Sequence, residues 1–153
     1  MQPRLNPFAV APEGYRAMSG LQAYANASGI EPALIELVKT RASQINGCAF
    51  CIDMHVTDAV KAGESQARLH LLNAWRETDL YTPRERAALA WTEALTLVAE
   101  THVPDDVYEE ALRHFSEKEL VELSWAIVAI NGWNRMCVSF RVPPASAKKS
   151  AAA

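Results

Sequence analysis

Two cysteines and a histidine lie close together in the middle of the chain, at spacings that could place them on one helix face. Cys48, Cys51 and His55 differ by three and four residues. On a helix, these spacings confine the three side chains to a strip of about 60°. Two thiols and an imidazole would then share one space, and an imidazole can accept or return a proton near neutral pH. The spacing therefore predicts an activated dithiol.

The residues before the motif indicate where its helix begins. Gly47 can adopt the positive φ that ends a preceding helix, so a new helix could start at about Cys48. Free amides and the positive end of the dipole at a helix N-terminus stabilise a thiolate relative to a thiol. This favours Cys48 as the more acidic thiol, whereas contact with His55 would favour Cys51 as the attacking one. The residues leave both possibilities open.

The same residues allow two other uses. A structural zinc site usually has four protein ligands, and His55 with the two thiolates would need a fourth from Glu36, Cys137 or a distant histidine. The second cysteine pair of a zinc ribbon is absent from the sequence, and His55 lies too far past Cys51 for a haem attachment motif. Alternatively, both thiols could pack as small core side chains. Cys137, in a mostly apolar helical stretch, is expected to be a buried and inert thiol.

The motif resembles the signature of a known family. The motif consists of Glu36, then eleven residues, then Cys48-x-x-Cys51, then three residues and His55. It is similar to the pattern of the alkyl hydroperoxidase D (AhpD) group in the carboxymuconolactone decarboxylase superfamily. The similarity covers about residues 30 to 100. Around the motif it includes Lys39-Thr40-Arg41-Ala42-Ser43, Asn46-Gly47 and Ala59-x-x-Ala62-Gly63.

The resemblance implies an enzyme, a thiol-dependent peroxidase or disulfide reductase that reduces organic hydroperoxides in antioxidant defence. Its catalytic residues would be Cys51, Cys48, His55 and Glu36. Glu36 would orient His55, Cys51 would attack the peroxide, and Cys48 would close the disulfide. No cofactor and no metal is implied. Relatives receive electrons from a lipoyl-bearing protein or another external dithiol and can pass them to a peroxiredoxin.

One departure from the family pattern bears on the substrate. Phe50 stands inside the Cys-x-x-Cys where some members carry a second histidine, so a proton relay through that histidine is lost. An apolar side chain here favours organic hydroperoxides over hydrogen peroxide. Two alternatives remain. One is a carboxymuconolactone-decarboxylase-type enzyme acting on a lactone acid without the dithiol, which the complete set of four residues argues against. The other is a non-enzymatic redox-sensing or zinc-stabilised helical protein.

Helical periodicity covers most of the chain and predicts an all-α, single-domain, AhpD-like bundle of about six or seven helices. Two capping boxes fix helix starts, Thr82-Pro83-Arg84-Glu85 and Ser116-x-x-Glu119. The expected helices span about 12–27, 32–46, 49–62, 65–77, 83–100, 104–114 and 120–138.

The expected organisation is an N-terminal arm at 1–11, a helical domain at 12–142 and a disordered tail at 143–153 that is rich in alanine. The helix at 120–138 is apolar nearly all round, so it should be central or lie at a subunit interface. Relatives assemble as trimers or hexamers. Together these points predict a homo-oligomer.

Composition narrows the class of protein. The chain has 153 residues, of which half are apolar, which suits one globular domain with a real core. A formal net charge of −3 gives no reason to expect nucleic acid or an anionic membrane as a partner. No apolar run is long enough for a transmembrane helix or a leader. Three cysteines argue against a disulfide framework, and we expect a cytoplasmic protein.

Overall fold

The computed structural model describes residues 2–150, and all regular secondary structure in this range is helical. The all-α fold predicted from the sequence is therefore confirmed. The elements in chain order are α1 (Pro7–Val10), α2 (Pro12–Asn26), α3 (Pro32–Ile45), α4 (Ala49–Lys61), α5 (Gln66–Leu71), the 3₁₀ helix η1 (Leu72–Glu77), α6 (Pro83–Thr96), α7 (Val98–Thr101), α8 (Asp105–His114), α9 (Glu117–Phe140) and α10 (Ala145–Ser150).

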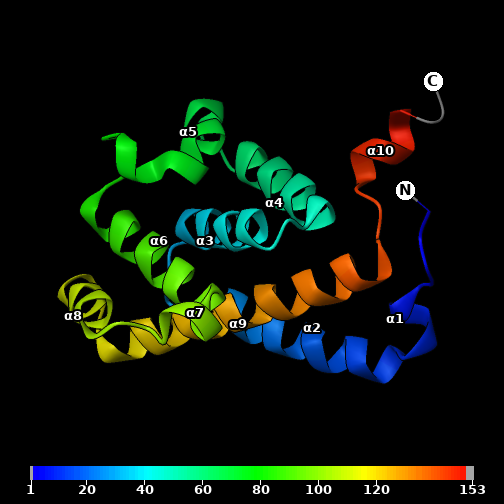
Figure 1. Cartoon of the computed structure of the whole chain (residues 1–153), viewed down its shortest axis with the longest axis horizontal. Coiled ribbons are helices and arrows are strands. Elements are labelled where there is room, and N and C mark those ends of the chain that lie inside the picture. Colours follow the sequence, from blue (N-terminus) through cyan, green and yellow to red (C-terminus); the bar gives the residue numbers. More distant parts are fainter. Residues whose placement is uncertain (1, 151–153) are drawn as a thin grey trace.

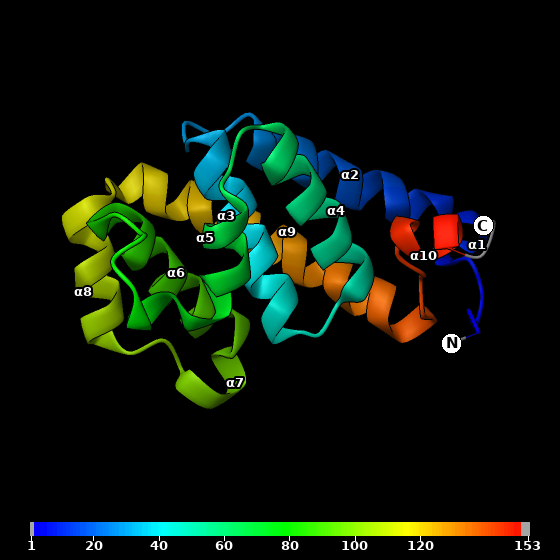
Figure 2. The ribbon, with the colours of Figure 1, turned by 90° about the horizontal axis from the view of Figure 1, so that it is seen from above.

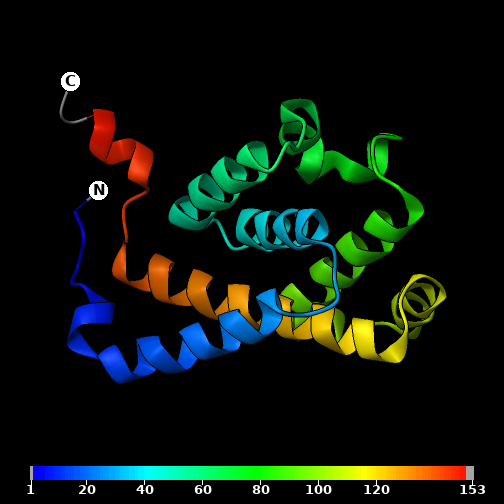
Figure 3. The ribbon, with the colours of Figure 1, turned by 180° about the vertical axis from the view of Figure 1, so that it is seen from behind.

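Helix α3 lies at the centre of the bundle. It packs against α4 on one side and against α6 and α9 on the others, while α2 runs alongside α9 (Figures 1 and 3). Seen from above, α4 lies over α3, and α8 and α10 occupy opposite ends of the molecule (Figure 2). Because α3 has neighbours on most sides, apolar side chains in successive positions, such as Leu37 and Val38, are fully buried. A functional side chain on α3 is therefore held by packing rather than left to move in solvent.

The helix starts agree with the sequence signals. Both capping boxes form. The Thr82 and Ser116 hydroxyls accept hydrogen bonds from the backbone amides of Glu85 and Glu119, and each glutamate carboxylate accepts one from the backbone amide of its cap residue. Helix α9 is central, as predicted. Its fully buried residues include Leu123, Ala126, Ile127, Ala129 and Ile130.

Two expected helices are interrupted. The stretch 65–77 divides into α5 and η1, with a non-helical Ala74 at φ −116° and ψ 27°. A 3₁₀ turn aligns residues three apart, which lets Leu72 and Trp75 both reach the core. The stretch 83–100 breaks at Leu97, after which the Thr101 hydroxyl donates back to the Ala94 carbonyl at 2.8 Å.

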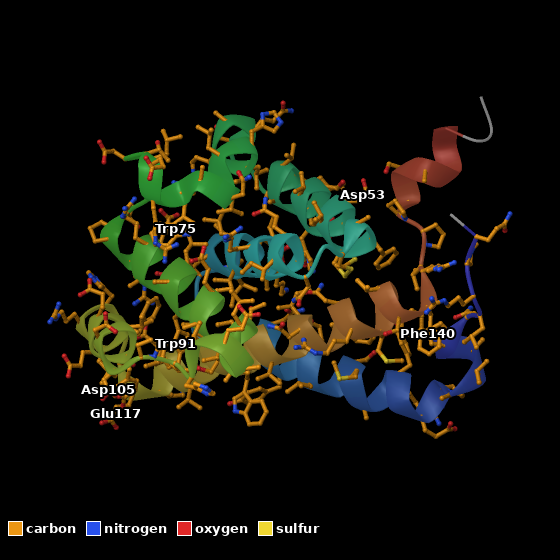
Figure 4. The ribbon with its side chains drawn as sticks, in the orientation of Figure 1. Asp53, Trp75, Trp91, Asp105, Glu117 and Phe140 are labelled. Atoms are coloured by element: carbon orange, nitrogen blue, oxygen red, sulfur yellow. A yellow bond between two sulfur atoms is a disulfide. The ribbon has the colours of Figure 1, made fainter. Side chains whose placement is uncertain are left out.

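Short helices lie at both ends of the expected domain. Within the arm, residues 7–10 form α1, and the Arg4 amide donates to the Phe140 carbonyl at the end of α9 (3.1 Å). Residues 145–150, within the tail expected at 143–153, form α10. The Ser146 amide donates to Asp53 on α4 (3.1 Å), and Figure 4 shows Asp53 facing α10. The last residues of the predicted tail, 151–153, lie outside the described range. Within residues 2–150, no helix is both long and apolar enough to cross a bilayer.

Candidate active site

The turn between α3 and α4 positions the two cysteines. Gly47 has φ +65°, which ends α3, and Cys48 is the N-cap of α4. The Cys51 amide donates to Cys48 Sγ at 3.4 Å, so this sulfur caps the helix. The predicted helix start, with Cys48 at the N-terminus where the first backbone amides are free, is therefore confirmed. The positive end of the dipole would stabilise a thiolate at this position.

Cys48 and Cys51 form a disulfide, so the structure shows the oxidised dithiol. Each cysteine is only 1 % exposed, and their Cα atoms are 5.4 Å apart. A reagent can therefore reach these sulfurs only through cavities that open beside them.

Glu36 meets His55 across the α3–α4 hairpin. Glu36 Oε2 and His55 Nδ1 are 2.8 Å apart, and the His55 side chain is 8 % exposed. The chain reverses between Ile45 and Cys48, so α3 and α4 pack side by side. Glu36 lies nine residues before Ile45 and His55 lies seven residues after Cys48, and the packing of the two helices brings their side chains into contact.

A buried lysine completes the polar cluster. Lys39 Nζ donates to Glu36 Oε1 and to Asn26 Oδ1, both at 3.1 Å. Burial raises the pKa of Glu36, but the hydrogen bond with His55 and the charge of Lys39 outweigh it, so this pKa lies below its ordinary value. An ionised Glu36 can only accept, so His55 carries its proton on Nδ1 and leaves Nε2 free to accept another.

The dithiol lies between two cavities. Cys51 lines a cavity of about 610 Å³, and Glu36, Lys39 and His55 line the same cavity. Cys48 opens to a second cavity of about 420 Å³, formed by the α3–α4 turn and the segment after α9. Phe50 and Cys137 line both cavities. The two cysteines of one disulfide thus line different cavities.

Three aromatic rings form an apolar wall of the larger cavity. Phe8, Tyr15 and Trp133 come from α1, α2 and α9, and their centroids are 5.3 to 5.9 Å apart in tilted or edge-on contacts. Part of the segment expected to be an N-terminal arm therefore builds the site. Helical periodicity could not reveal this, because α1 is only four residues long.

Cys137 is buried, as predicted, and lies beside the disulfide. The sulfur atoms of Cys48, Cys51 and Cys137 all lie within 4.8 Å of one another. Burial raises the pKa of the Cys137 thiol to about 11. A structural zinc site would need a fourth ligand. Within residues 2–150 this cluster consists of the three cysteine sulfurs alone, and the side chains of Glu36 and His55 are hydrogen-bonded to each other.

An asparagine cluster that the sequence did not single out holds the cysteine turn against α9. The Asn46 side-chain amide donates to Asn131 and Asn134, both at 2.9 Å, and to the Ala42 carbonyl at 3.0 Å. Asn134, fully buried, in turn donates to Ser43 Oγ at 3.0 Å. The sequence held one signal for this cluster, namely the polar residues within the otherwise apolar pattern at 120–138.

The chain is similar to proteins of one family. The model of the carboxymuconolactone decarboxylase family matches residues 12–94, more than half of the chain. The uncharacterized protein YdfG of Bacillus subtilis is 43 % identical over 139 residues, which cover 91 % of this chain and 95 % of that protein.

Solved structures agree with this assignment. A protein of unknown function from Agrobacterium tumefaciens, described as a candidate antioxidant defence protein AhpD, has a TM-score of 0.91 and 45 % identity over 94 % of this chain and 98 % of that chain. The debrominase Bmp8 has a TM-score of 0.81 at 21 % identity, covering 94 % of this chain and 77 % of its own, and so shares the fold. This chain therefore belongs to the carboxymuconolactone decarboxylase family and is one of its AhpD-like members.

Proposed function

We propose that this protein is a thiol-dependent peroxidase that reduces organic hydroperoxides through the Cys48–Cys51 pair. The observation that carries the proposal is the Glu36–His55 hydrogen bond of 2.8 Å in the cavity that also receives Cys51. A histidine held in this way offers Nε2 as a base on the same helix as the thiol, one turn away. The family membership and the relative described as a candidate antioxidant protein support the same activity.

The reaction begins with the reduced dithiol. His55 accepts the proton of Cys51, and the thiolate attacks the terminal oxygen of the hydroperoxide. The oxygen–oxygen bond breaks, the alkoxide takes the proton back from His55 and leaves as an alcohol, and Cys51 becomes a sulfenic acid. The Cys48 thiol then attacks the Cys51 sulfur, which releases water and forms the disulfide seen in the structure. One hydroperoxide and two thiols thus give one alcohol, one water and one disulfide.

The shape of the larger cavity favours a substrate with an apolar group. Phe8, Tyr15 and Trp133 line it together with Phe50 and Met54, so the alkyl or aryl part of an organic hydroperoxide would be removed from water on binding. Hydrogen peroxide has no such part. In single-turnover experiments, cumene hydroperoxide should oxidise the dithiol faster than hydrogen peroxide; equal rates would remove the preference.

Turnover requires an external dithiol, because the buried disulfide must be reduced again. The smaller cavity supports Cys48 as the sulfur that the reductant attacks, since it opens beside Cys48 and is lined by Gly47, Arg141 and Pro143. A lipoyl group on a partner protein has a long flexible arm that suits such an opening, and a peroxiredoxin could receive the electrons onward. Reduction by a lipoyl domain should outpace reduction by a bulky folded dithiol protein of equal potential.

Intact mass tests the central step. The reduced, metal-free protein is treated with one equivalent of cumene hydroperoxide in a Cys137→Ala background, which removes the third sulfur, and Cys48→Ser and Cys51→Ser are compared in that background. The background protein should lose two hydrogens, Cys48→Ser should gain one oxygen, and Cys51→Ser should stay unchanged. If Cys51→Ser traps the oxygen instead, Cys48 is the attacking thiol. Three unchanged masses over minutes would exclude the peroxidase.

A further inference from the structure

The third sulfur beside the disulfide has no role in the proposed reaction. Cys137 comes from α9, which packs against α4, and its sulfur completes a cluster in which all three sulfurs lie within 4.8 Å. Each of the three cysteines is at most 3 % exposed. After reduction of the disulfide, this place therefore offers three thiols around one small volume.

The surroundings of the cluster limit the charge that it can hold. The three cysteines pack with Ala42 and Ile130, and partly buried Phe8, Phe50, Trp133 and Val142 cover them. A net charge in such apolar surroundings is costly unless it is paired. Three thiolates around Zn²⁺ leave one negative charge and an empty fourth position, and three around Cu⁺ leave two negative charges. A trivalent centre leaves none.

We propose that the reduced protein binds a trivalent metalloid, arsenic or antimony, as a neutral complex with Cys48, Cys51 and Cys137. Three thiols and arsenous acid give one arsenic–sulfur bond at each cysteine and three waters. The arsenic stays trivalent, so no oxidant or reductant takes part. At each cysteine the thiol proton combines with the hydroxyl displaced from arsenic and leaves as water. A weakly acidic Cys137 thiol therefore does not prevent the reaction.

Both cavities give a path to the cluster. Cys137 lines each of them, Cys51 is reached from the larger one and Cys48 from the smaller one. Arsenous acid is small and uncharged at neutral pH, so it can enter an apolar cavity more easily than a hydrated metal cation can. Bound arsenic would occupy both thiols of the redox pair, and so would also stop any reaction that depends on them.

The experiment compares two probes on two proteins. Arsenous acid can bond three thiols, whereas methylarsonous acid has only two exchangeable hydroxyls and can bond two. The reduced wild type and Cys137→Ala are titrated with each under anaerobic conditions and analysed by native mass spectrometry and by near-ultraviolet absorption of the arsenic–sulfur bonds. Circular dichroism checks that the variant is folded, and Cys137→Val provides a second variant with an apolar side chain of greater volume.

Wild type with arsenous acid should show a complex that has lost three waters, whereas Cys137→Ala should show loss of two. Removal of the third sulfur should weaken arsenous acid binding by roughly tenfold or more. The affinity for methylarsonous acid should be the same in wild type and variant. Equal arsenous acid affinities, or a wild-type complex that has lost only two waters, would overturn the proposal. Because binding is measured without peroxide, failure of the peroxidase proposal would leave this result unaffected.

Discussion

At the scale of single residues, the contact with the Glu36 carboxylate determines which ring nitrogen of His55 carries the proton. Lys39 offsets part of the carboxylate charge but does not displace His55, since Lys39 bonds Glu36 Oε1 and His55 bonds Glu36 Oε2. The pKa of Glu36 is held below its ordinary value, so the carboxylate is ionised throughout the neutral range. His55 then keeps its proton on Nδ1, and Nε2 remains the only ring atom that can take the thiol proton.

Replacement of this charge should slow the proposed chemistry. In Glu36→Gln the amide can still accept from Nδ1, but it no longer stabilises the imidazolium that forms when His55 takes a proton. We expect single-turnover oxidation of the dithiol by cumene hydroperoxide to slow by roughly 10- to 100-fold, less than the full effect of a general base of about 100-fold or more, because His55 itself remains. Stopped-flow measurement of tryptophan fluorescence, calibrated by intact mass, gives this rate.

Glu93→Gln is the matched control for that variant. Glu93 is about as buried as Glu36, and it accepts from Arg41 Nε and Trp75 Nε1, both at 2.8 Å. Its carboxylate lines neither cavity beside the dithiol. The control should lose stability but keep the wild-type oxidation rate. A comparable loss of rate in both variants would mean that Glu36 supports only the fold.

The cysteines and His55 could be predicted from spacing because all three lie within two turns of one helix. Glu36 could not be assigned by the same argument, because its partner lies across a reversal of the chain and a helical glutamate is usually solvated. The family pattern supplied it, and the Glu36–His55 bond agrees with that expectation. Asn26, which accepts from Lys39, lies on α2 and was invisible to any local spacing.

At the scale of elements, the α3–α4 hairpin depends on its attachment to α9. The bonds of Asn46 to Asn131 and Asn134 fix the turn that carries Cys48. Asn134 is fully buried and also donates to Ser43, so its removal takes one hydrogen bond from Asn46 and one from Ser43 in the core.

Asn134→Ala should therefore be destabilising. We expect the free energy of unfolding to fall by about 2 to 3 kcal/mol, since a buried amide is lost and its partners stay desolvated. Urea denaturation followed by circular dichroism measures this change. Asn73→Ala, at an exposed position of η1, is the control and should change stability by less than about 0.5 kcal/mol. Similar effects of the two substitutions would contradict the role given to the asparagine cluster.

The capping box at the start of α9 predicts a specific acid sensitivity. Glu119 accepts from the Ser116 amide and hydroxyl, both at 2.8 Å, and from Arg84 at 2.7 Å. The bonds from Ser116, followed by the bond from Arg84, lower the pKa of Glu119 to about 2, against 4.5 as its ordinary value. Because the folded state holds this carboxyl ionised, the stabilisation is complete above pH 4.5 and is lost as the pH falls toward 2.

Glu119→Gln should be less stable than wild type by about 1 kcal/mol at pH 7, a typical value for one element of a helix cap. The difference should shrink steadily between pH 4.5 and 2, where wild-type Glu119 becomes neutral too. Urea unfolding of both proteins at pH 7, 4, 3 and 2 follows the two curves. A difference that is independent of pH would show that the charge does not contribute.

Helix starts were the most predictable elements, because each capping box is complete within four residues. The breaks at Ala74 and Leu97 were not predictable, since they arise where buried side chains and distant carbonyls set the path of the chain. Helix α10 was not among the expected helices for a similar reason. Its anchor is Asp53, 93 positions away in the sequence, and composition contains no information on such a contact.

At the scale of the whole molecule, α9 has an exposed apolar strip that no element within residues 2–150 covers. Val121, Trp125 and Val128 lie four and three positions apart on one side of the helix, and they are 55, 43 and 47 % exposed. An exposed tryptophan flanked by two valines is typical of an interface core. The strip agrees with the homo-oligomer expected from the sequence, and we propose that α9 contacts another copy in it.

Trp125→Glu should separate the subunits of the expected homo-oligomer. A charge at the centre of an apolar contact would be buried without a partner, so the variant should sediment at a lower mass than wild type while its far-ultraviolet circular dichroism stays unchanged. Val60→Glu places the same charge at a valine of α4 that is 39 % exposed and should leave the assembly intact. A wild type that is monomeric at micromolar concentration, or a Trp125→Glu variant of wild-type mass, would remove α9 from the interface.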